Sequence, residues 1–169
     1  MKIKSAWCAI LFCLTATVAL GQTVSVNYNQ SQSFAGYHTY AWGPDNANQV
    51  KNSILAQVAM QNIDAALQAK GLTKVEANQT PDLIVTASGG MKEQTTYTAM
   101  GMRGWGGGMA TVTPQQNVIG TLIVDLDDAK TQSLVWRGIG QNTLSNNGSK
   151  NQQTVQKAVT KMFKQWPKT

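Results

Sequence analysis

The stretch VIGTLIVDLDDAKTQSLVWRGIGQ, residues 118–141, predicts the fold most directly. Its two apolar runs, residues 118–125 and 133–141, are rich in the β-branched and aromatic side chains that strands favour. The connection at residues 127–131 contains Asp and Thr, which suit a type I turn better than a tight two-residue hairpin. The stretch therefore predicts two neighbouring antiparallel strands.

Three more strands are expected upstream of this pair. Residues 23–29 and 37–42 alternate apolar or aromatic residues with polar ones, the period of a strand with one buried face. Residues 82–88 form a short apolar run after Pro81, whose ring favours an extended residue before it. This third run is predicted to lie inside the sheet.

A long helix is predicted over residues 46–70. Asp45 or Asn46 is placed to cap its first free N–H groups, and Gly71 follows its end, where a left-handed turn is usual. Its apolar residues recur at helical spacing over a broad face. Such a helix is expected to pack on a flat surface.

A second helix is predicted at the C-terminus. Ser149 and Gln152 have the spacing of a capping box, and Pro167 ends the helix. The order of elements predicts an α+β fold, with an antiparallel or mixed sheet of about five or more strands and both helices packed on one face.

Residues 89–116 have a different composition, with seven glycines, four methionines and little periodicity. No regular element is predicted there, and we expect a long Gly/Met-rich excursion. Residues 94–98 and 109–113 could pair within it as a ragged hairpin.

The N-terminus resembles a cleavable export signal. Lys2 and Lys4 precede an apolar segment at residues 6–20, and Ala19-Leu20-Gly21 provides a small-x-small exit. We therefore expect a signal peptide at residues 1–21, a single domain at 22–169, and a periplasmic or secreted protein that is not integral to the membrane after cleavage.

Signal cleavage would also remove both cysteines. Cys13 follows the bulky Phe12, where a lipoprotein signal needs a small residue, so a lipid anchor is not expected. The mature chain would contain no thiol and a single histidine, His38. Catalytic triads, Cys–His nucleophiles and His-rich metal sites would all lack parts.

The acidic motif Asp125-x-Asp127-Asp128 has carboxylates of the kind that calcium binds. The spacing of an EF-hand fails, because Lys130 stands where its glycine belongs and Trp136 where its glutamate belongs. A carboxylate that accepts backbone N–H groups in the turn is the simpler interpretation. We predict no catalytic residue, no cofactor and no metal.

The excursion and the C-terminal helix contain the candidate contact residues. Thioethers suit copper(I), but methionines in an irregular segment are also adaptable apolar contacts. Five lysines of the last twenty residues group on one helical face, either as a solvated back face or as a docking stripe for anionic lipid or glycan. Nucleic acid is a poor partner for an exported chain. The candidates are Met100, Met102, Trp105, Met109, Lys157, Lys161 and Lys164.

Five short motifs are distributed over the mature chain. They are Phe34-x-x-Tyr37-x-Thr39-Tyr40-x-Trp42, Ala69-Lys70-Gly71-Leu72, Pro81-Asp82-Leu83-Ile84-Val85, Gly120-Thr121-Leu122-x-Val124-Asp125-x-x-Asp128-Ala129 and Leu134-Val135-Trp136-Arg137-Gly138. Together they resemble the DUF4136 family over essentially the whole mature chain. The resemblance implies an exported bacterial envelope protein, in many members a lipoprotein, and supplies no catalytic residue.

The expected function is that of a noncatalytic binding or interaction module of the cell envelope. One alternative is a structural envelope subunit that pairs through a sheet edge, such as residues 23–29. The other is a hydrolase that uses carboxylates, which would require Asp125, Asp128 and His38 to converge.

Overall fold

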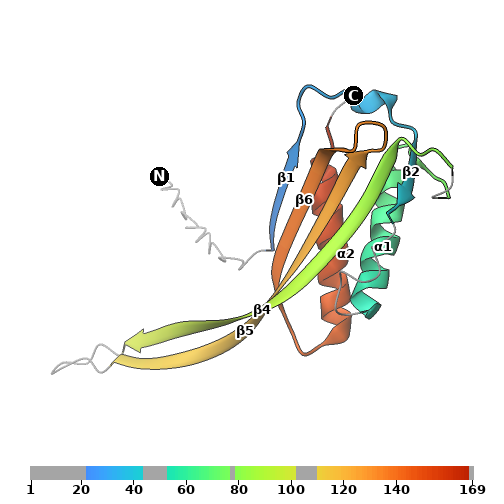
Figure 1. The fold of residues 1–169 in the computed structure, drawn as a ribbon. Coiled ribbons are helices and arrows are strands. Elements are labelled where there is room, and N and C mark those ends of the chain that lie inside the picture. The colour runs from blue at the N-terminus through green and yellow to red at the C-terminus, as the bar shows by residue number, and fades with distance from the viewer. Residues whose placement is uncertain (1–21, 44–52, 77–78, 102–109, 168–169) are drawn as a thin grey trace, which may run out of the picture.

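The computed structural model describes residues 22–43, 53–76, 79–101 and 110–167. Within these ranges the chain forms six β-strands, one short 3-10 helix and two α-helices (Figure 1). In chain order they are β1 (Thr23–Tyr28), η1 (Phe34–Gly36), β2 (Thr39–Trp42), α1 (Ser53–Gln68), β3 (Thr73–Lys74), β4 (Leu83–Gly101), β5 (Ala110–Asp128), β6 (Ser133–Leu144) and α2 (Gly148–Lys164).

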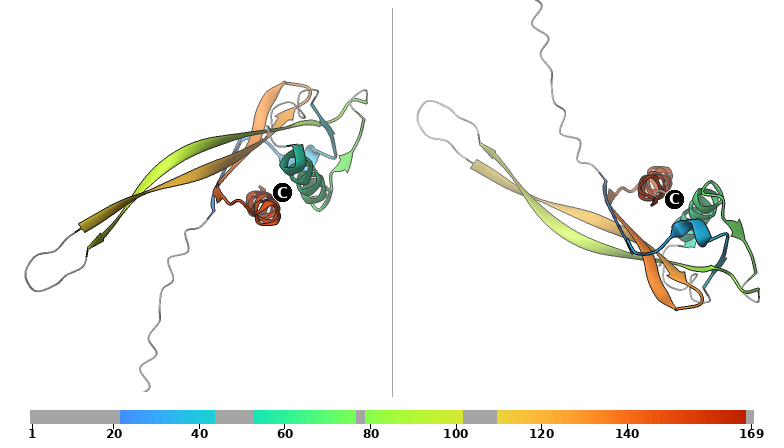
Figure 2. Two further views of the ribbon diagram at one scale, coloured as in Figure 1. Left: turned by 90° about the horizontal axis from the view of Figure 1, so that it is seen from below. Right: turned by 90° about the horizontal axis from the view of Figure 1, so that it is seen from above.

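The described strands form one mixed sheet in the order β1-β6-β5-β4-β2-β3. Strand β2 is parallel to β3 and β4, and the other pairs are antiparallel. Both helices lie on the same face of the sheet (Figure 2). The predicted α+β fold, with its sheet of five or more strands covered on one face, is confirmed.

The segment that decided the prediction forms the centre of the sheet. Strands β5 and β6 are antiparallel neighbours, with Ile123 opposite Ile139, and a bulge lies at Leu126/Asp127. Strand β1 pairs with β6 and so lies at one edge. A two-residue strand, β3, forms the other edge. Nothing in the periodicity of the sequence had indicated β3.

Helix α2 approaches the sheet closely because β6 has glycines beneath it. A Cβ atom on Gly138 would lie 2.7 Å from Cη2 of Trp136, and one on Gly140 would lie 2.8 Å from Cε of Met162. Met162 and Trp136 are both fully buried. Because these glycines have no side chains, α2 packs closely on β6 and buries its apolar face in the core.

Helix α1 buries Ala59, Ile63 and Leu67, one turn apart. Gly71 has a φ of +88°, the left-handed conformation predicted after the helix. The predicted start at residue 46 and its cap, Asp45 or Asn46, lie outside the described residues.

The predicted capping box of α2 is wrong. Asn147 is the N-cap, and its side chain accepts a hydrogen bond from the backbone N–H of Lys150. The helix begins at Gly148, so Ser149 already lies in its first turn. Asn is as good a cap as Ser, and it stands one residue before the glycine that begins the helix.

The prediction of an irregular excursion at residues 89–116 is also wrong for the residues that are described. Strands β4 and β5 continue to Gly101 and from Ala110, nineteen residues each, and their paired ends project from the sheet (Figures 1 and 2). We call residues 94–101 and 110–117 the arm, because the last pair between β5 and β6 is Val118↔Leu144.

The register of the arm differs from the expected ragged hairpin. Gln94 pairs with Asn117 and Thr98 with Thr113, so residues 94–98 face 113–117 rather than 109–113. The ladder runs without a bulge from Leu83↔Asp128 to Gly101↔Ala110. Pairing in the body of the sheet therefore sets the register of the arm.

Candidate functional site

One face of the arm and its root carries four exposed apolar side chains. Tyr97 is 71% exposed, Val112 56%, Met91 49% and Val118 36%. Directly opposite residues of an antiparallel pair share a face, and the register places these four side chains on the same one, with the exposed polar residues Glu93, Thr95 and Gln116 between them. The stripe is the continuation of the face that buries Leu83 beneath the helices.

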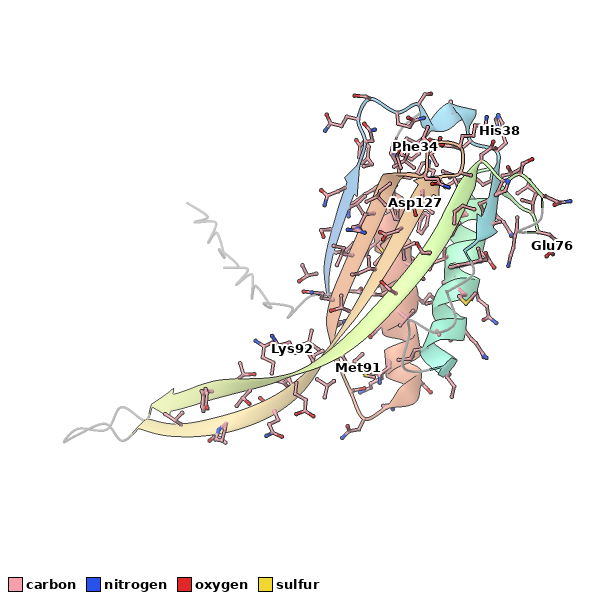
Figure 3. The ribbon with its side chains drawn as sticks, in the orientation of Figure 1. Phe34, His38, Glu76, Met91, Lys92 and Asp127 are labelled. Carbon is pink, nitrogen blue, oxygen red and sulfur yellow. The ribbon has the colours of Figure 1, made fainter. Side chains whose placement is uncertain are left out.

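The opposite face of the arm is polar. It presents exposed Gln94, Thr96 and Thr98, and Asn117 donates a hydrogen bond of 2.7 Å to the hydroxyl of Thr96. Met91 and Lys92 mark the root of the arm in Figure 3. The arm is therefore an amphipathic ribbon whose apolar side is not covered by the described part of the chain.

The arm also has open strand edges. Strand β2 pairs with β4 only over Leu83–Val85, and β6 pairs with β5 no further than Val118. Along the arm, neither strand has an outer partner among the described strands. Such edges offer backbone N–H and C=O groups to another chain.

An open pocket lies at the root of the arm, between the sheet and the two helices. Its volume is about 650 Å³, including its mouth. None of the described residues that line it is charged or aromatic. Its apolar lining includes Leu55, Ala59, Leu122, Leu144, Val155 and Ala158.

The pocket is open because glycines on β4, β5 and β6 have no side chains to fill the space at the root of the arm. Gly89 and Gly140 flank Leu122 in adjacent strands, and Gly120 lies between Met91 and Asn142. Helix α1 contributes Leu55 to the wall. The rim is polar but neutral, and it includes Gln22, Thr121, Gln141, Asn142 and Thr154.

Carboxylates gather at the opposite end of the sheet. A broad, open cleft of about 1360 Å³ is lined in part by Asp82, Asp127, Asp128 and Lys130. Asp82 Oδ2 accepts hydrogen bonds from the backbone N–H of His38 at 2.9 Å. These bonds, with those from Thr39, lower the pKa of Asp82.

Asp128 is the carboxylate of the predicted turn, and that interpretation is confirmed. Its Oδ1 accepts hydrogen bonds from the backbone N–H groups of Lys130 and Thr131, and its Oδ2 from the hydroxyl of Tyr37. The bond to the Thr131 N–H is the largest cause of the lowered pKa of Asp128. Burial and the Asp128 carboxylate raise the pKa of Tyr37 to about 12.

The residues that a carboxylate hydrolase would need do not converge. Asp125 forms a two-pronged ion pair with Arg137, both bonds at 2.6 Å, and Asp128 binds its own turn. The side chain of His38 is exposed. Burial raises the pKa of Asp127, with the Asp125 carboxylate as a second cause. Among the described residues, no cluster of three His, Cys, Asp or Glu side chains could hold a metal ion.

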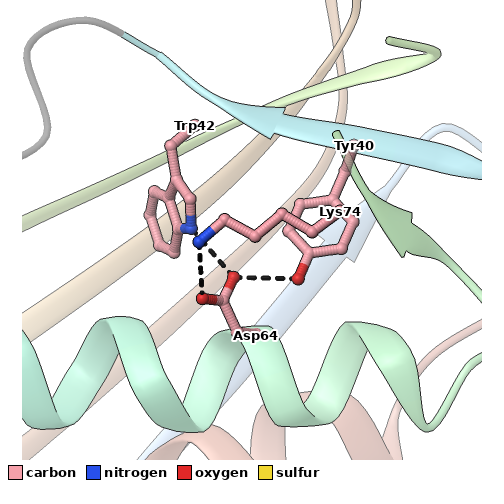
Figure 4. A network of polar contacts seen from close by, with 4 residues as sticks. All are labelled: Tyr40, Trp42, Asp64 and Lys74. Atoms are coloured by element: carbon pink, nitrogen blue, oxygen red, sulfur yellow. Dashed lines mark hydrogen bonds and ion pairs between the residues drawn. The ribbon is translucent and has the colours of Figure 1, made fainter. Parts of the chain in front are cut away.

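A third polar cluster joins α1 to the sheet edge. Asp64 Oδ1 accepts hydrogen bonds from the hydroxyl of Tyr40 at 2.8 Å and from Nε1 of Trp42 at 2.9 Å, while Lys74 binds Oδ2 at 3.0 Å (Figure 4). Burial and the bond to Asp64 raise the pKa of Tyr40. This cluster holds the helix against β2 and β3.

The motifs of the family resemblance thus contact one another. Tyr37 bonds Asp128, Thr39 bonds Asp82, and the Asp82 carbonyl accepts the N–H of Ala129 at 2.9 Å. The ring of Phe34 meets that of Trp166 at 5.2 Å. These residues hold the end of the fold together, which explains their presence without any chemistry at the cleft.

The predicted contact residues have different positions. Met102, Trp105 and Met109 lie outside the described residues, and Met100 pairs with Thr111 near the end of β4. The three helix lysines, Lys157, Lys161 and Lys164, are exposed on α2, and among the described residues they form no ion pair.

Sequence reasoning missed the exposed apolar stripe and the pocket. Residues 92–96 are all polar, so no apolar–polar alternation marked this part of β4 as a strand. The pocket has no local signal, because its glycines come from three strands. Within the described part of the chain, neither helix has the length and apolar character to cross a bilayer.

The family model described as "Domain of unknown function (DUF4136)" matches residues 24–168. A comparison with curated proteins finds no match.

Two solved structures share the fold. One is a PDZ domain protein from Parabacteroides distasonis, with a TM-score of 0.60 and 17% sequence identity over 88% of this chain. The chain spans only 36% of that protein. The other is PelC from Paraburkholderia phytofirmans, solved as a dodecamer, with a TM-score of 0.50 and 16% identity over 84% of this chain and 97% of that one.

Proposed function

The chain belongs to the DUF4136 family, and on that premise we propose that it is an exported, noncatalytic binding module of the cell envelope that contacts its partner through the arm. The observation that carries this proposal is the apolar stripe. Two-stranded ribbons are marginally stable alone in water, and large apolar side chains exposed together on one face, with polar residues around them, are typical of contact sites. An unidentified envelope component is the proposed partner.

The hydrogen bonds of the carboxylates favour a binding function over hydrolysis. Asp82, Asp125 and Asp128 each accept hydrogen bonds from groups that build the fold. Burial raises the pKa of Asp127, but general acid–base chemistry needs a second group in reach of the same substrate atom. A hydrolase is therefore the less favoured function.

Export is part of the proposal and rests on residues 1–21, with Lys2 and Lys4 ahead of the apolar segment. Mass spectrometry of protein purified from its native host tests it. We expect an N-terminus near Gln22 with no attached lipid. An intact Met1 or Lys2 terminus would contradict export.

The arm is tested by a cross-linking pull-down from native envelope. The test variant is Tyr97→Ser with Val112→Thr, which removes apolar area from one face of the arm. The matched control is Thr96→Ser with Thr113→Ser on the polar face. We expect the test variant to recover less than a tenth of the partner, and the control to recover the normal amount, since ~1.4 kcal/mol of lost apolar contact changes affinity tenfold.

Equal recovery by the two variants would reject the arm as the contact surface. Far-UV circular dichroism of both variants checks that the sheet is intact. Because all four side chains are exposed, we expect less than about 0.5 kcal/mol of difference in unfolding free energy.

A structural subunit is the second candidate, favoured by the open edges of β1 and of the arm. The likeness to PelC, solved as a dodecamer and matched over 97% of its length, supports this candidate at the level of the fold. Size-exclusion chromatography with light scattering over a range of concentrations tests it. A monomer at every concentration would reject pairing between copies.

A further inference from the structure

We propose that the pocket at the root of the arm binds one alkyl chain of an anionic lipid. The pocket shares Met91 with the exposed stripe, but none of its described lining residues belongs to the arm itself. Its enclosed part is narrow, about 80 Å³, which suits a single hydrocarbon chain rather than a bulky ligand.

The lining favours a saturated hydrocarbon over other ligands. Its walls are aliphatic side chains and bare glycine backbone, including Leu55, Leu144 and Val155. A nucleotide or a sugar would need buried hydrogen-bonding groups or an aromatic platform, and none of the described lining residues is charged or aromatic. Each methylene buried in such a wall is expected to strengthen binding about fourfold.

The rim has no charged side chain among its described residues that would bind a strongly polar ligand. Its side chains are neutral amides and hydroxyls, and Gln22 already donates its amide to the carbonyl of Thr154 at 2.8 Å. A ligand bound here would place its tail inside and its head group at the mouth.

The lysines of α2 next to the pocket favour an anionic head group, while the nearest acidic side chain on β4, Glu93, lies two residues beyond Met91 toward the arm. Thr154 lines the pocket on α2, and Lys150 and Lys157 stand four residues before and three residues after it. Positions at these spacings are neighbours on a helix surface. Both lysines are exposed, they form no ion pair among the described residues, and no acidic side chain lies in the first turn of α2.

The binding test uses the purified chain and a fluorescent fatty acid, dansyl-undecanoic acid, which is displaced by unlabelled competitors. We expect saturable binding of one probe per chain and displacement by laurate. Octanoate, with four fewer methylenes, is expected to compete at least about tenfold less well. Dodecyltrimethylammonium, which has a cationic head, is expected to compete about threefold or more less well than tridecanoate, which has the same twelve-carbon tail and an anionic head.

Two pocket variants test the location. Val155→Trp fills the space from α2, and Leu144→Asp places a charge in its wall from β6; both positions are only partly buried. We expect each to weaken laurate at least about tenfold. Circular dichroism and denaturant unfolding identify a variant that fails to fold, and the other then decides the result.

A charge reversal tests the head group. Lys150→Glu with Lys157→Glu is expected to weaken laurate and strengthen dodecyltrimethylammonium, each by about threefold. Lys164→Glu is the matched control, because it changes an exposed lysine at the far end of the same helix. It is expected to leave both affinities unchanged.

Absence of saturable probe binding, or full laurate affinity in a folded pocket variant, would overturn the proposal. Equal affinity for the anionic and cationic detergents would overturn the part of the proposal that assigns an anionic head group. The arm variant Tyr97→Ser with Val112→Thr should bind laurate normally, so a failed pull-down and a failed lipid titration remain distinguishable.

Discussion

Thr39 and Asp82 bond each other reciprocally across the junction of β2 and β4. The hydroxyl of Thr39 donates to Asp82 Oδ2 at 2.9 Å and accepts from the Asp82 N–H at 3.0 Å, and the Thr39 N–H also donates to Oδ2 at 3.0 Å. The two residues are 43 positions apart in the chain. Their bonds fix the start of β4 against β2.

Removing this carboxylate should destabilise the protein. Asp82→Ala leaves the Thr39 and His38 N–H groups without their acceptor, and we expect a loss of about 2 kcal/mol in the free energy of unfolding. A double-mutant cycle with Thr39→Val should show a coupling of at least about 0.5 kcal/mol. Urea unfolding measures both, with exposed Thr73→Val as the control. Additive effects would contradict the reciprocal bond.

Acid should weaken the fold through the same group. Hydrogen bonds hold the pKa of Asp82, and that of Asp128, below the ordinary value of 3.8. Because the native pKa lies below the unfolded one, the ionised carboxylate stabilises the fold fully above the unfolded-state pKa. This stabilisation is lost as the pH falls through the native pKa. We expect Asp82→Asn to lose less stability than the wild type between about pH 4 and pH 2. Denaturant midpoints across this range measure it; parallel curves would reject the assignment.

Gly138 should not tolerate a side chain. A Cβ atom there would lie 2.7 Å from the Trp136 ring and 3.0 Å from Sδ of Met162, and both neighbours are fully buried. We expect Gly138→Ala to cost about 1–3 kcal/mol by overpacking. Gly36→Ala is the matched control, since its Cβ would meet nothing within 4 Å. Thermal unfolding compares the two, and equal midpoints would disprove the close approach of α2.

The Asp64 cluster should depend on its buried donors rather than on its ion pair. Asp64→Ala leaves the hydroxyl of the fully buried Tyr40 without this acceptor, and we expect a loss of about 1–3 kcal/mol. Lys74→Ala breaks only a half-exposed ion pair and should cost less than about 1 kcal/mol. Chemical denaturation of both variants measures the difference. Similar losses would contradict this ranking.

Much of the candidate site was beyond reach of the sequence. Met91 and Tyr97 lie on one face, but the residues between them are all polar and, with the nearby glycines, look like those of a loop. The pocket depends on Gly89, Gly120 and Gly140 meeting in adjacent strands, and a register is a property of pairs. The lysine face of α2 was predictable, because helical periodicity is local.

The sequence by itself determined the strands and helices of the body except β3, the left-handed end at Gly71 and the turn role of Asp128. Those features follow from backbone preferences within a few residues. Only the tertiary structure decided that β4 and β5 extend as an arm and where an apolar pocket opens. These depend on contacts between distant residues, which a local pattern does not encode.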